Sequence, residues 1–537
     1  MRESPDHFAR EEVLPVTNVL MSAADYRESL RAYSPRVYCN GEQVTSVADD
    51  PRLAPGVAAV GVTYDLAVQA DTRALMVAEQ ATSGLQVNRM LHINRHEDDL
   101  LSKLEACRLV CRETGCAQRY LTHDALNAIF QLSHRLAEDG ADERPDRFLA
   151  YLHEVQRRDL TLGVAMTDGK GDRRLHPHAQ PNADSYVRVV ARRADGIVIR
   201  GVKAIVTGAP YMHELLVMPC RTMGEADADY AVCCAVPIDA PGLTIVTRPA
   251  GRPGEPAAKF SARYGQSTGV CIFEDVFVPH ERVFMAGEWM HSELLVTSYA
   301  AHHRHSCIGA RAGFGDLLIG AGLLMAEANG LDPNRVQHIR EDLVELITIV
   351  EGFFACGVAA STYALVDPAG NVQPEPVFAN IGKLLLANQI YDMHRLAHEV
   401  SGGLVVALPG PDEDHNPATA AKLSELLTAR ADVPYAQRME VARLMEDLTA
   451  SNTAGWYSVI SLHGGGSPQA MKREIHRNYP LPERRALVER LLDRGVASTG
   501  QSGAPPRRRQ LGKCCAVGCE GPDGATGAQA TEGDRTG

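Results

Sequence analysis

A block of short β-type segments divides this chain into two helical halves. From Leu160 to Phe284, apolar residues fall into brief runs such as Tyr186–Arg193 and Gly196–Lys203, which turns such as Ala240-Pro241-Gly242 separate. On both sides of the block, apolar residues recur at spacings of three and four, the pattern of amphipathic helices. This order predicts a β-barrel or β-sandwich between two helical domains.

These changes of pattern predict an α+β fold in four parts. Residues 1–158 form an N-terminal helical domain, 159–286 the β domain, 287–495 a C-terminal helical bundle, and 496–537 a disordered tail rich in Gly, Pro, Ala and Arg. The expected helices include Ser22–Ala32, Leu66–Gln80, Asp98–Thr114, Asp124–Ala137, Asp146–Arg158, Leu317–Asn329, Val336–Val366, Phe378–Gly402 and Tyr435–Ala450. The expected strands include Leu215–Pro219, Tyr230–Val236, Leu243–Thr247, Gly269–Phe273 and Val276–Val278.

Charge and hydropathy exclude several classes of function. The net charge of -13 over 537 residues argues against a nucleic-acid binder. No uninterrupted apolar run reaches the roughly 18 to 20 residues of a membrane span, and residues 1–12 lack an apolar signal core. We therefore expect a cytoplasmic protein without a membrane partner. In that compartment the 13 cysteines are expected to be free thiols.

The stretch Ala300–Asp316 concentrates three histidines, a cysteine and two arginines at the start of an apolar helical region. Buried polar groups need partners, so these residues are costly to place there without a function. His303 and Cys307 are four residues apart and share one face of a helix. The stretch fits a metal site, a substrate pocket or a solvated helix start.

A family resemblance rests on several segments. They are Ala165–Gln180 (AMTDGKGDRRLHPHAQ), Ala183-Asp184-Ser185 with the run that follows it, Phe273–Phe284 (FEDVFVPHERVF), Ser401–Pro409 (SGGLVVALP) and Glu446–Ser451 (EDLTAS). With them the chain resembles the 4-hydroxyphenylacetate 3-hydroxylase family over roughly residues 20 to 490. Within the family it looks most like the 4-hydroxybutyryl-CoA dehydratase/vinylacetyl-CoA isomerase branch.

The resemblance implies an acyl-CoA dehydrogenase-like fold, a homotetramer, and FAD bound between the β domain and the C-terminal bundle. No GxGxxG strand-to-helix fingerprint is present, so a Rossmann crevice is not expected. The residues it implies at the cofactor are Met166, Thr167, Asp168, Thr207, Gly208, Ala209, Ser451 and Asn452, with Gln337 reaching from a neighbouring subunit.

The dehydratase branch carries a [4Fe–4S] cluster on three cysteines and one histidine. Read position by position, these ligands fall on Cys116, Tyr120, His303 and Ala310. Tyrosine and alanine cannot supply thiolates, so the sequence argues against the cluster and predicts no metal site. Acid–base residues of that branch fall on Thr268, Gly465, Cys307 and Arg311. A rearranged cluster that uses Cys107, Cys111 and Cys307 remains an alternative.

The substrate residues of the hydroxylase branch are absent as well, because their positions fall near Leu121 and on Ala125 and Val164. Our leading interpretation is an FAD-dependent monooxygenase that hydroxylates a small organic substrate with FADH2 from a separate flavin reductase. His303 acts as acid or base, Arg311 holds a substrate anion, and Tyr120 donates a hydrogen bond to it. The alternatives are a cluster-free acyl-CoA dehydratase, isomerase or desaturase, and a non-catalytic flavin-binding subunit.

Overall fold

Helix α7 (Ser292–Ala328) is the central element of the fold. The computed structural model describes residues 20–492, and they belong to one compact unit. Along α7 the buried residues include the whole run from Ala301 to Gly315, because other helices pack on every side of it. The predicted tail, residues 496–537, lies outside the described residues.

The N-terminal part supplies six helices and four short strands. The helices are α1 (Ala23–Leu30), α2 (Ala54–Val68), α3 (Arg73–Met76), α4 (Glu97–Thr114), α5 (Tyr120–Glu138) and α6 (Arg144–Arg157). The strands are β1 (Arg36–Cys39), β2 (Glu42–Gln43), β3 (Val77–Gln80) and β4 (Leu85–Asn88).

The central part forms two sheets. Its strands are β5 (Leu162–Ala165), β6 (Arg188–Arg192), β7 (Gly196–Thr207), β8 (Glu214–Val217), β9 (Val232–Pro237), β10 (Leu243–Thr247), β11 (Thr268–Pro279) and β12 (Val283–Ala286). One sheet has the order β2-β1-β10-β11-β7-β6, and the other has the order β12-β9-β8-β5. Both contribute side chains to one apolar core, for example Ile245 and Phe273 from the first and Leu215 and Val236 from the second.

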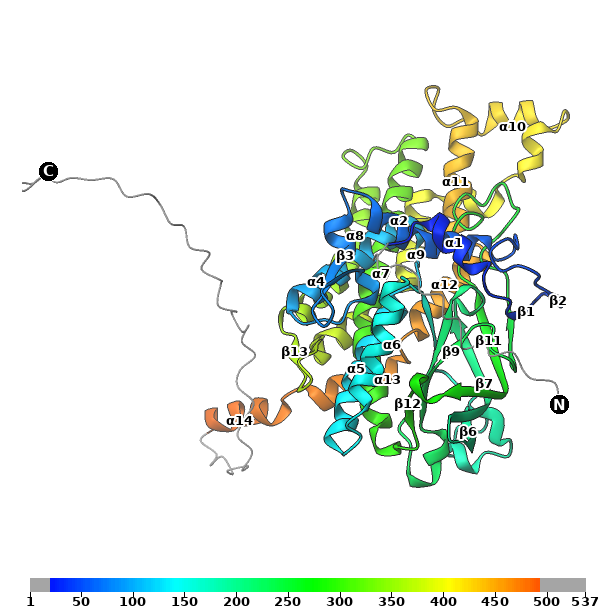
Figure 1. The fold of residues 1–537 in the computed structure, drawn as a ribbon. Coiled ribbons are helices and arrows are strands. Elements are labelled where there is room, and N and C mark those ends of the chain that lie inside the picture. The colour runs from blue at the N-terminus through cyan, green and yellow to red at the C-terminus, as the bar shows by residue number, and fades with distance from the viewer. Residues whose placement is uncertain (1–19, 493–537) are drawn as a thin grey trace, which may run out of the picture. The chain divides into compact units, whose positions relative to one another are not determined.

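The C-terminal part is a helical bundle around α7. It contains α8 (Gln337–Thr362), α9 (Pro376–Ser401), α10 (Ala420–Leu426), α11 (Tyr435–Thr449), α12 (Asn452–His463), α13 (Pro468–Asn478) and α14 (Leu481–Leu491), with the short strands β13 (Leu365–Val366) and β14 (Val372–Gln373). In Figure 1 strands β7, β9 and β11 gather on the right and helices α4, α7 and α8 on the left.

Two predicted elements differ from the structure. The helix expected over Leu66–Gln80 is wrong, because α2 ends at Val68 and Val77–Gln80 pairs with β4 as a strand. The strands expected at Gly269–Phe273 and Val276–Val278 are one strand, β11. A bulge at Asp275 (φ 56°) interrupts its pairing with β7, and this local change of direction reads as a strand end in the sequence.

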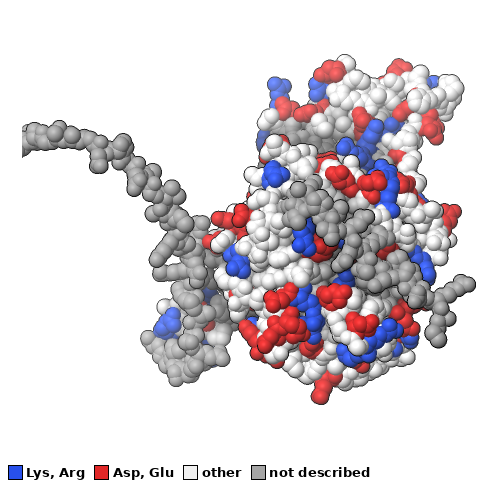
Figure 2. All heavy atoms as spheres, viewed as in Figure 1, with Lys and Arg blue, Asp and Glu red and all other residues white. Residues whose placement is uncertain are grey.

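Helices α7 and α8 are long and apolar enough to cross a membrane by length and composition. In α7, 67% of the most apolar window is buried inside the protein, so packing against α4, α5 and α9 accounts for its composition. On the face drawn in Figure 2, acidic and basic side chains are interspersed.

Candidate functional site

Helices α5 and α7 bring three side chains into one hydrogen-bonded row. The Nδ1 atom of His303 lies 3.1 Å from Oδ2 of Asp124, and its Nε2 atom lies 3.7 Å from Sγ of Cys307. Asp124 is fully buried, whereas His303 and Cys307 are 8% and 9% exposed. Sequence analysis singled out His303 and noted the spacing to Cys307. It missed Asp124, which is 179 residues away from His303.

The carboxylate of Asp124 is held from its other side. Ser306 donates a hydrogen bond to Oδ1 (2.6 Å), and the Lys103 ammonium lies 3.7 Å from the same atom and donates to Ser306 (2.8 Å). Burial disfavours the charged form, but Lys103, His123 and His303 hold the pKa of Asp124 well below its usual range. Asp124 is therefore a fixed anion that is hydrogen-bonded to the imidazole ring of His303.

Asp124 and Cys307 also set the charge on His303. Burial lowers the pKa of this imidazole, but the neighbouring thiol and carboxylate outweigh it and raise the pKa above the ordinary value. Burial raises the pKa of Cys307, whereas His303, Lys383 and Arg311 lower it and prevail. A buried thiol and a buried histidine therefore favour a thiolate and an imidazolium together.

Three further cations surround this pair. Arg311 donates to Ser461 (2.6 Å) and to the carbonyl of Gly115 (3.1 Å). Arg304 donates to the carbonyl of Gly465 (2.9 Å) and to Oδ1 of Asn380 (2.7 Å), and Lys383 donates to the carbonyl of Ser461 (2.6 Å). All three are at least 95% buried, and none has a carboxylate within ion-pair distance among residues 20–492. Burial lowers the pKa of Lys383 to about 8.

Buried cations without a carboxylate counter-ion are costly. Three such cations around one thiolate therefore favour the binding of an anionic ligand. Gly465 packs closely against them, because a Cβ atom there would lie 3.3 Å both from the His303 ring and from Cγ of Arg304. The position that matches a glutamate in the dehydratase branch is thus next to His303 and too tight for a larger side chain without movement of its neighbours.

Aromatic rings line the other side of the imidazole. Tyr299 and Tyr120 stack on His303 with centroid distances of 5.3 Å and 6.1 Å. The Tyr120 hydroxyl lies 3.2 Å from Sγ of Cys116, and burial raises the pKa of this phenol well above its ordinary value. The structure thus brings His303 and Tyr120 together, with Arg311 one helical turn beyond Cys307 on α7.

The predicted cofactor residues occupy two parts of the β domain. Met166 and Thr167 follow β5, and their carbonyls accept hydrogen bonds from Nζ of Lys203 (2.9 Å) and from the backbone N–H of Ala204 (2.8 Å). Oδ1 of Asp168 lies 2.7 Å from Nζ of Lys203, so this carboxylate fastens the loop to β7. These contacts position the loop and leave Met166 and Thr167 partly exposed.

Thr207, Gly208 and Ala209 end β7 beside unsatisfied polar atoms. Gly208 adopts a left-handed conformation (φ 70°) and donates its N–H to the carbonyl of Ser267 (2.9 Å), while Thr207 pairs with Thr268. The buried atoms Nε2 and Oε1 of Gln266 and Oγ1 of Thr268 have no hydrogen-bond partner among the described residues. Buried polar atoms are normally satisfied, so these fit a polar ligand.

An exposed apolar face adjoins these atoms on the six-stranded sheet. Ile205 is 62% exposed, and Val246 and Val270, which pair across β10 and β11, are 46% and 37% exposed. Ile205 has a φ of 62°, a strained conformation for a β-branched residue. The Arg248 guanidinium lies 5.4 Å from the ring of Trp456 and has no ion-pair partner in the described part of the chain. A flat apolar face, polar atoms and a free cation fit a planar ring system that carries phosphates, as FAD does.

The remaining predicted cofactor residues are spread over α8 and α12. Ser451 is the N-cap of α12, accepting the backbone N–H of Ala454 (3.1 Å), and Asn452 next to it is exposed. Gln337, at the start of α8, donates to Glu341 (2.8 Å) on the surface. Within one chain no contact joins Gln337 to the other predicted cofactor residues among residues 20–492. Its predicted contact with FAD is therefore one made to a neighbouring subunit.

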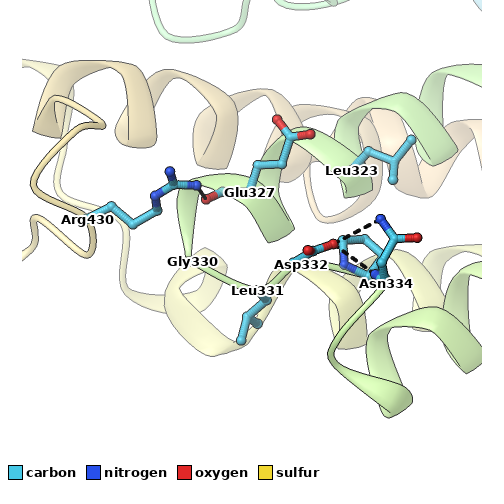
Figure 3. A pocket seen from close by; sticks show the side chains of 8 residues that line it. Leu323, Glu327, Gly330, Leu331, Asp332, Asn334 and Arg430 are labelled. Carbon is cyan, nitrogen blue, oxygen red and sulfur yellow. Dashed lines mark hydrogen bonds between the residues drawn. The ribbon is translucent and has the colours of Figure 1, made fainter.

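An open cleft of about 700 Å³ lies at the C-terminal end of α7 (Figure 3). It is lined by Leu323, Glu327, Gly330, Leu331, Asp332, Pro333, Asn334 and Arg430. Its polar groups satisfy one another, since Arg430 donates to the carbonyl of Glu327 (3.1 Å) and Asn334 donates to Asp332 (2.9 Å). Leu323 is sixteen residues beyond Cys307 on α7, which is about 24 Å along the helix. The cleft is therefore separate from the buried site.

Family models describe both halves of the chain. The N-terminal model of 4-hydroxyphenylacetate 3-hydroxylase matches residues 22–285, and the C-terminal model matches residues 292–493. The chain belongs to the 4-hydroxyphenylacetate 3-hydroxylase family. The resemblance seen in the sequence is thereby confirmed.

Curated members of this family include enzymes of two kinds. The 4-hydroxybutyryl-CoA dehydratase/vinylacetyl-CoA-Delta-isomerase of Clostridium aminobutyricum is 33% identical over 88% of this chain and 99% of that protein. The oxygenase component of 4-hydroxyphenylacetate 3-monooxygenase from Thermus thermophilus is 26% identical over 88% of this chain and 98% of that protein.

Solved structures of the family share the fold. An oxygen-tolerant archaeal 4-hydroxybutyryl-CoA dehydratase from N. maritimus has a TM-score of 0.86 at 32% identity, covering 90% of this chain and 97% of that one. The oxygenase component of 4-hydroxyphenylacetate 3-monooxygenase complexed with FAD has a TM-score of 0.77 at 23% identity, covering 88% and 99%.

The donor set does not fit the cluster that the dehydratase branch implies. At the matched positions Tyr120 bonds to Cys116, Ala310 is a buried methyl group, and both ring nitrogens of His303 already have partners. Among residues 20–492 no group of three or more His, Cys, Asp and Glu side chains is arranged to hold a metal ion. Cys307 lies instead beside His303, with Sγ 3.7 Å from Nε2 of the ring.

Proposed function

We propose that this family member is an FAD-dependent enzyme that moves a proton within a small unsaturated acyl thioester and thereby shifts its double bond. The observation that carries the proposal is the buried His303–Asp124 pair beside Arg304, Arg311 and Lys383. The relative that is 33% identical has a dehydratase and an isomerase activity in its name, and our proposal takes up the isomerase activity.

The chemistry asks for a proton carrier and a positive environment. The α-proton of a β,γ-unsaturated thioester is acidic, because the resulting anion spreads over the carbonyl group and the double bond. His303, oriented by Asp124, takes this proton and returns it to the γ-carbon. Arg311 and Lys383 stabilise the negative charge that develops meanwhile.

Dehydration would require removal of a proton that is only weakly acidic. In the dehydratase branch this step is associated with the cluster, and two of its four ligand positions are Tyr120 and Ala310 in this chain. Isomerisation needs only the acid–base groups that are present. Thr207 and Gln266 would hold FAD, which would supply an electron-accepting ring system when bound. Following the resemblance, we also propose a cytoplasmic homotetramer.

The oxygenase component of a two-component monooxygenase is the second candidate. It is favoured by the 26% identical oxygenase component and would take FADH2 from a separate flavin reductase. The buried thiol of Cys307 favours the isomerase, because an ionised thiol in a pocket that handles activated oxygen is readily oxidised.

Deuterium incorporation distinguishes the two functions. The FAD-loaded protein is mixed with a β,γ-unsaturated acyl-CoA in D2O, and the α,β-unsaturated product is expected to carry deuterium at the γ-carbon. His303→Gln should slow the shift by about 10²–10⁴-fold, the usual contribution of one acid–base group. His415→Gln, at an exposed histidine, should leave it unchanged. Hydroxylation of a phenol with FADH2 and oxygen, without any double-bond shift, would contradict the proposal and favour the oxygenase.

A further inference from the structure

Cys307, His303 and Asp124 form a row that runs from two slightly exposed side chains to a fully buried one. Cys307 and His303 keep 9% and 8% of their surface exposed, and Asp124 behind them keeps none. Sγ lies 3.7 Å from Nε2 of the ring, and Nδ1 lies 3.1 Å from the carboxylate. The thiol thus faces Nε2 of the imidazole, and the carboxylate faces Nδ1. This is the arrangement of an activated nucleophile.

The row is fixed in position from several elements. Ser306 and Lys103 hold the second oxygen of Asp124, and the stacked ring of Tyr299 holds the plane of His303. His303 and Cys307 are on one helix at a spacing of four residues, so the backbone of α7 sets their distance. A nucleophile and its base need this kind of support to keep a productive geometry.

The surroundings of Cys307 favour its ionised form. The charged or titratable groups that affect it include His303 and Arg311 on α7, Lys383 on α9, Tyr120 on α5 and Cys107 on α4, and Arg304 and Tyr299 on α7 also interact with it. The first three are cations, and together they lower the pKa of the thiol against the effect of burial. Tyr120 and Cys107 stay neutral, because burial raises the pKa of each.

We propose that Cys307 takes over the acyl group of the thioester substrate and forms an acyl-enzyme. The Cys307 sulfur forms a bond to the carbonyl carbon, and the bond from that carbon to the carrier sulfur breaks. The carrier leaves as a thiolate and takes the Nε2 proton of His303, so one thioester replaces another without oxidation or reduction. The step rests on the proposed function for the class of substrate, a small acyl thioester.

Acyl transfer also explains how His303 becomes a base. While Cys307 is a thiolate, the charged form of His303 predominates, and little of the neutral base is present. Once the thiolate is acylated, His303 has given its proton to the departing thiol and is neutral beside the acyl chain. It can then remove the α-proton, and the reverse transfer releases the product on its carrier.

The test uses butyryl-CoA, a saturated thioester that has no double bond to shift. FAD-loaded protein is mixed with it, quenched in acid and digested, and the peptide that contains Cys307 is weighed by mass spectrometry. We expect a butyryl adduct that hydroxylamine removes, and none in Cys307→Ala. The matched control is Cys356→Ala, which removes a half-buried thiol of α8 outside the site and should keep the adduct on Cys307.

The outcomes separate this inference from the proposed function. An adduct on Cys307 in a protein that shifts no double bond supports acyl transfer and contradicts the isomerase. Absence of an adduct on Cys307, or an isomerase rate in Cys307→Ala within about twofold of the parent, overturns acyl transfer and leaves the isomerase standing. Iodoacetamide should also alkylate Cys307 faster than Cys356 at pH 7, and His303→Gln should remove most of this advantage.

Discussion

Asp124 determines the charge balance of the site at the scale of single residues. Its carboxylate is the anion that faces both the Lys103 ammonium (3.7 Å) and the His303 ring (3.1 Å), and all three groups are at least 90% buried. A buried cation that loses its partner is strongly destabilising. Asp124 therefore contributes to folding through Lys103 and to chemistry through His303.

Replacing Asp124 by asparagine keeps the shape and removes the charge. We expect the free energy of unfolding at pH 7.5 to fall by about 3–5 kcal/mol, because Lys103 becomes an unpaired buried cation. The double-bond shift should slow at least tenfold, because His303 loses the carboxylate that orients its ring. Urea unfolding and the deuterium assay measure both effects. Asp142→Asn, at an exposed position, is the control, and equal stability of the two variants would contradict the prediction.

Replacing Gln266 by an apolar residue is expected to stabilise the FAD-free protein and to weaken FAD binding. Both polar atoms of its amide are buried without partners among the described residues, which costs about 1–3 kcal/mol in the absence of a ligand. Gln266→Leu should therefore raise the thermal stability of the FAD-free protein. It should weaken FAD binding about tenfold or more, as measured by quenching of flavin fluorescence. Stronger FAD binding by the variant would show that the amide faces no cofactor.

At this scale the sequence predicts the site residues of α7 better than the residues that other helices bring to them. His303 and Cys307 are recognisable because they share a helix and a spacing of four. Asp124 and Lys383 are not, because their meeting with α7 depends on how α5, α7 and α9 pack. The unsatisfied amide of Gln266 has no signature in the sequence.

Two glycines set the approach of α4 and α7 at the scale of elements. A Cβ atom on Gly309 would lie 2.4 Å from the carbonyl oxygen of Leu104, and one on Gly313 would lie 2.4 Å from that of Arg108. Both contacts are with backbone atoms that cannot move aside. The close approach is also what lets Lys103 on α4 reach Ser306 on α7.

Alanine substitutions along α7 should therefore have opposite effects. Gly309→Ala forces the helices apart and should lower the free energy of unfolding by about 1–3 kcal/mol. Gly320→Ala on the same helix meets no atom within 4 Å and should raise it by about 0.4–1 kcal/mol through helix propensity. Urea unfolding of both variants is the measurement. Destabilisation by Gly320→Ala as large as that by Gly309→Ala would show that close packing is not the cause.

Element boundaries show why periodicity alone falls short. The expected helix Leu317–Asn329 is the end of α7, which begins at Ser292, because buried polar residues such as His302 and Arg304 break the apolar pattern of its first half. By contrast, Leu243–Thr247 is β10 with the bounds that the sequence predicts, and Asp98–Thr114 differs from α4 by one residue.

The order of helical and β regions is predictable at the scale of the whole molecule, but the path of the sheet is not. Strand β1 lies in the part of the chain expected to be helical, yet it pairs in parallel with β10, about two hundred residues later. Pairing between strands so far apart in the chain has no local sequence pattern, because a four-residue strand has little periodicity. The family resemblance, in contrast, draws on segments from the entire chain.

Buried neutral histidines should make the whole protein sensitive to mild acid. Burial lowers the pKa of His123 and His394 to about 4 and of His213 to about 3, and it also lowers the pKa of His92, His302 and His305. The stability that these groups contribute is fully present above the ordinary pKa of 6.5 and is lost as the pH falls towards the folded values. His303, whose folded pKa is raised, contributes fully below 6.5 and does not offset this loss.

His213 allows this effect to be measured at one residue. Its Nδ1 accepts the backbone N–H of Thr161 (2.9 Å), so protonation would break that bond. Between pH 7.5 and 5.0 one such histidine costs about 2 kcal/mol, since 1.5 pH units below the unfolded pKa correspond to that free energy. His213→Gln should therefore lose about 2 kcal/mol less than the parent over this range in urea unfolding, whatever its stability at pH 7.5. His415→Gln should follow the parent, and an unchanged pH slope in His213→Gln would show that this histidine takes up its proton in the folded state.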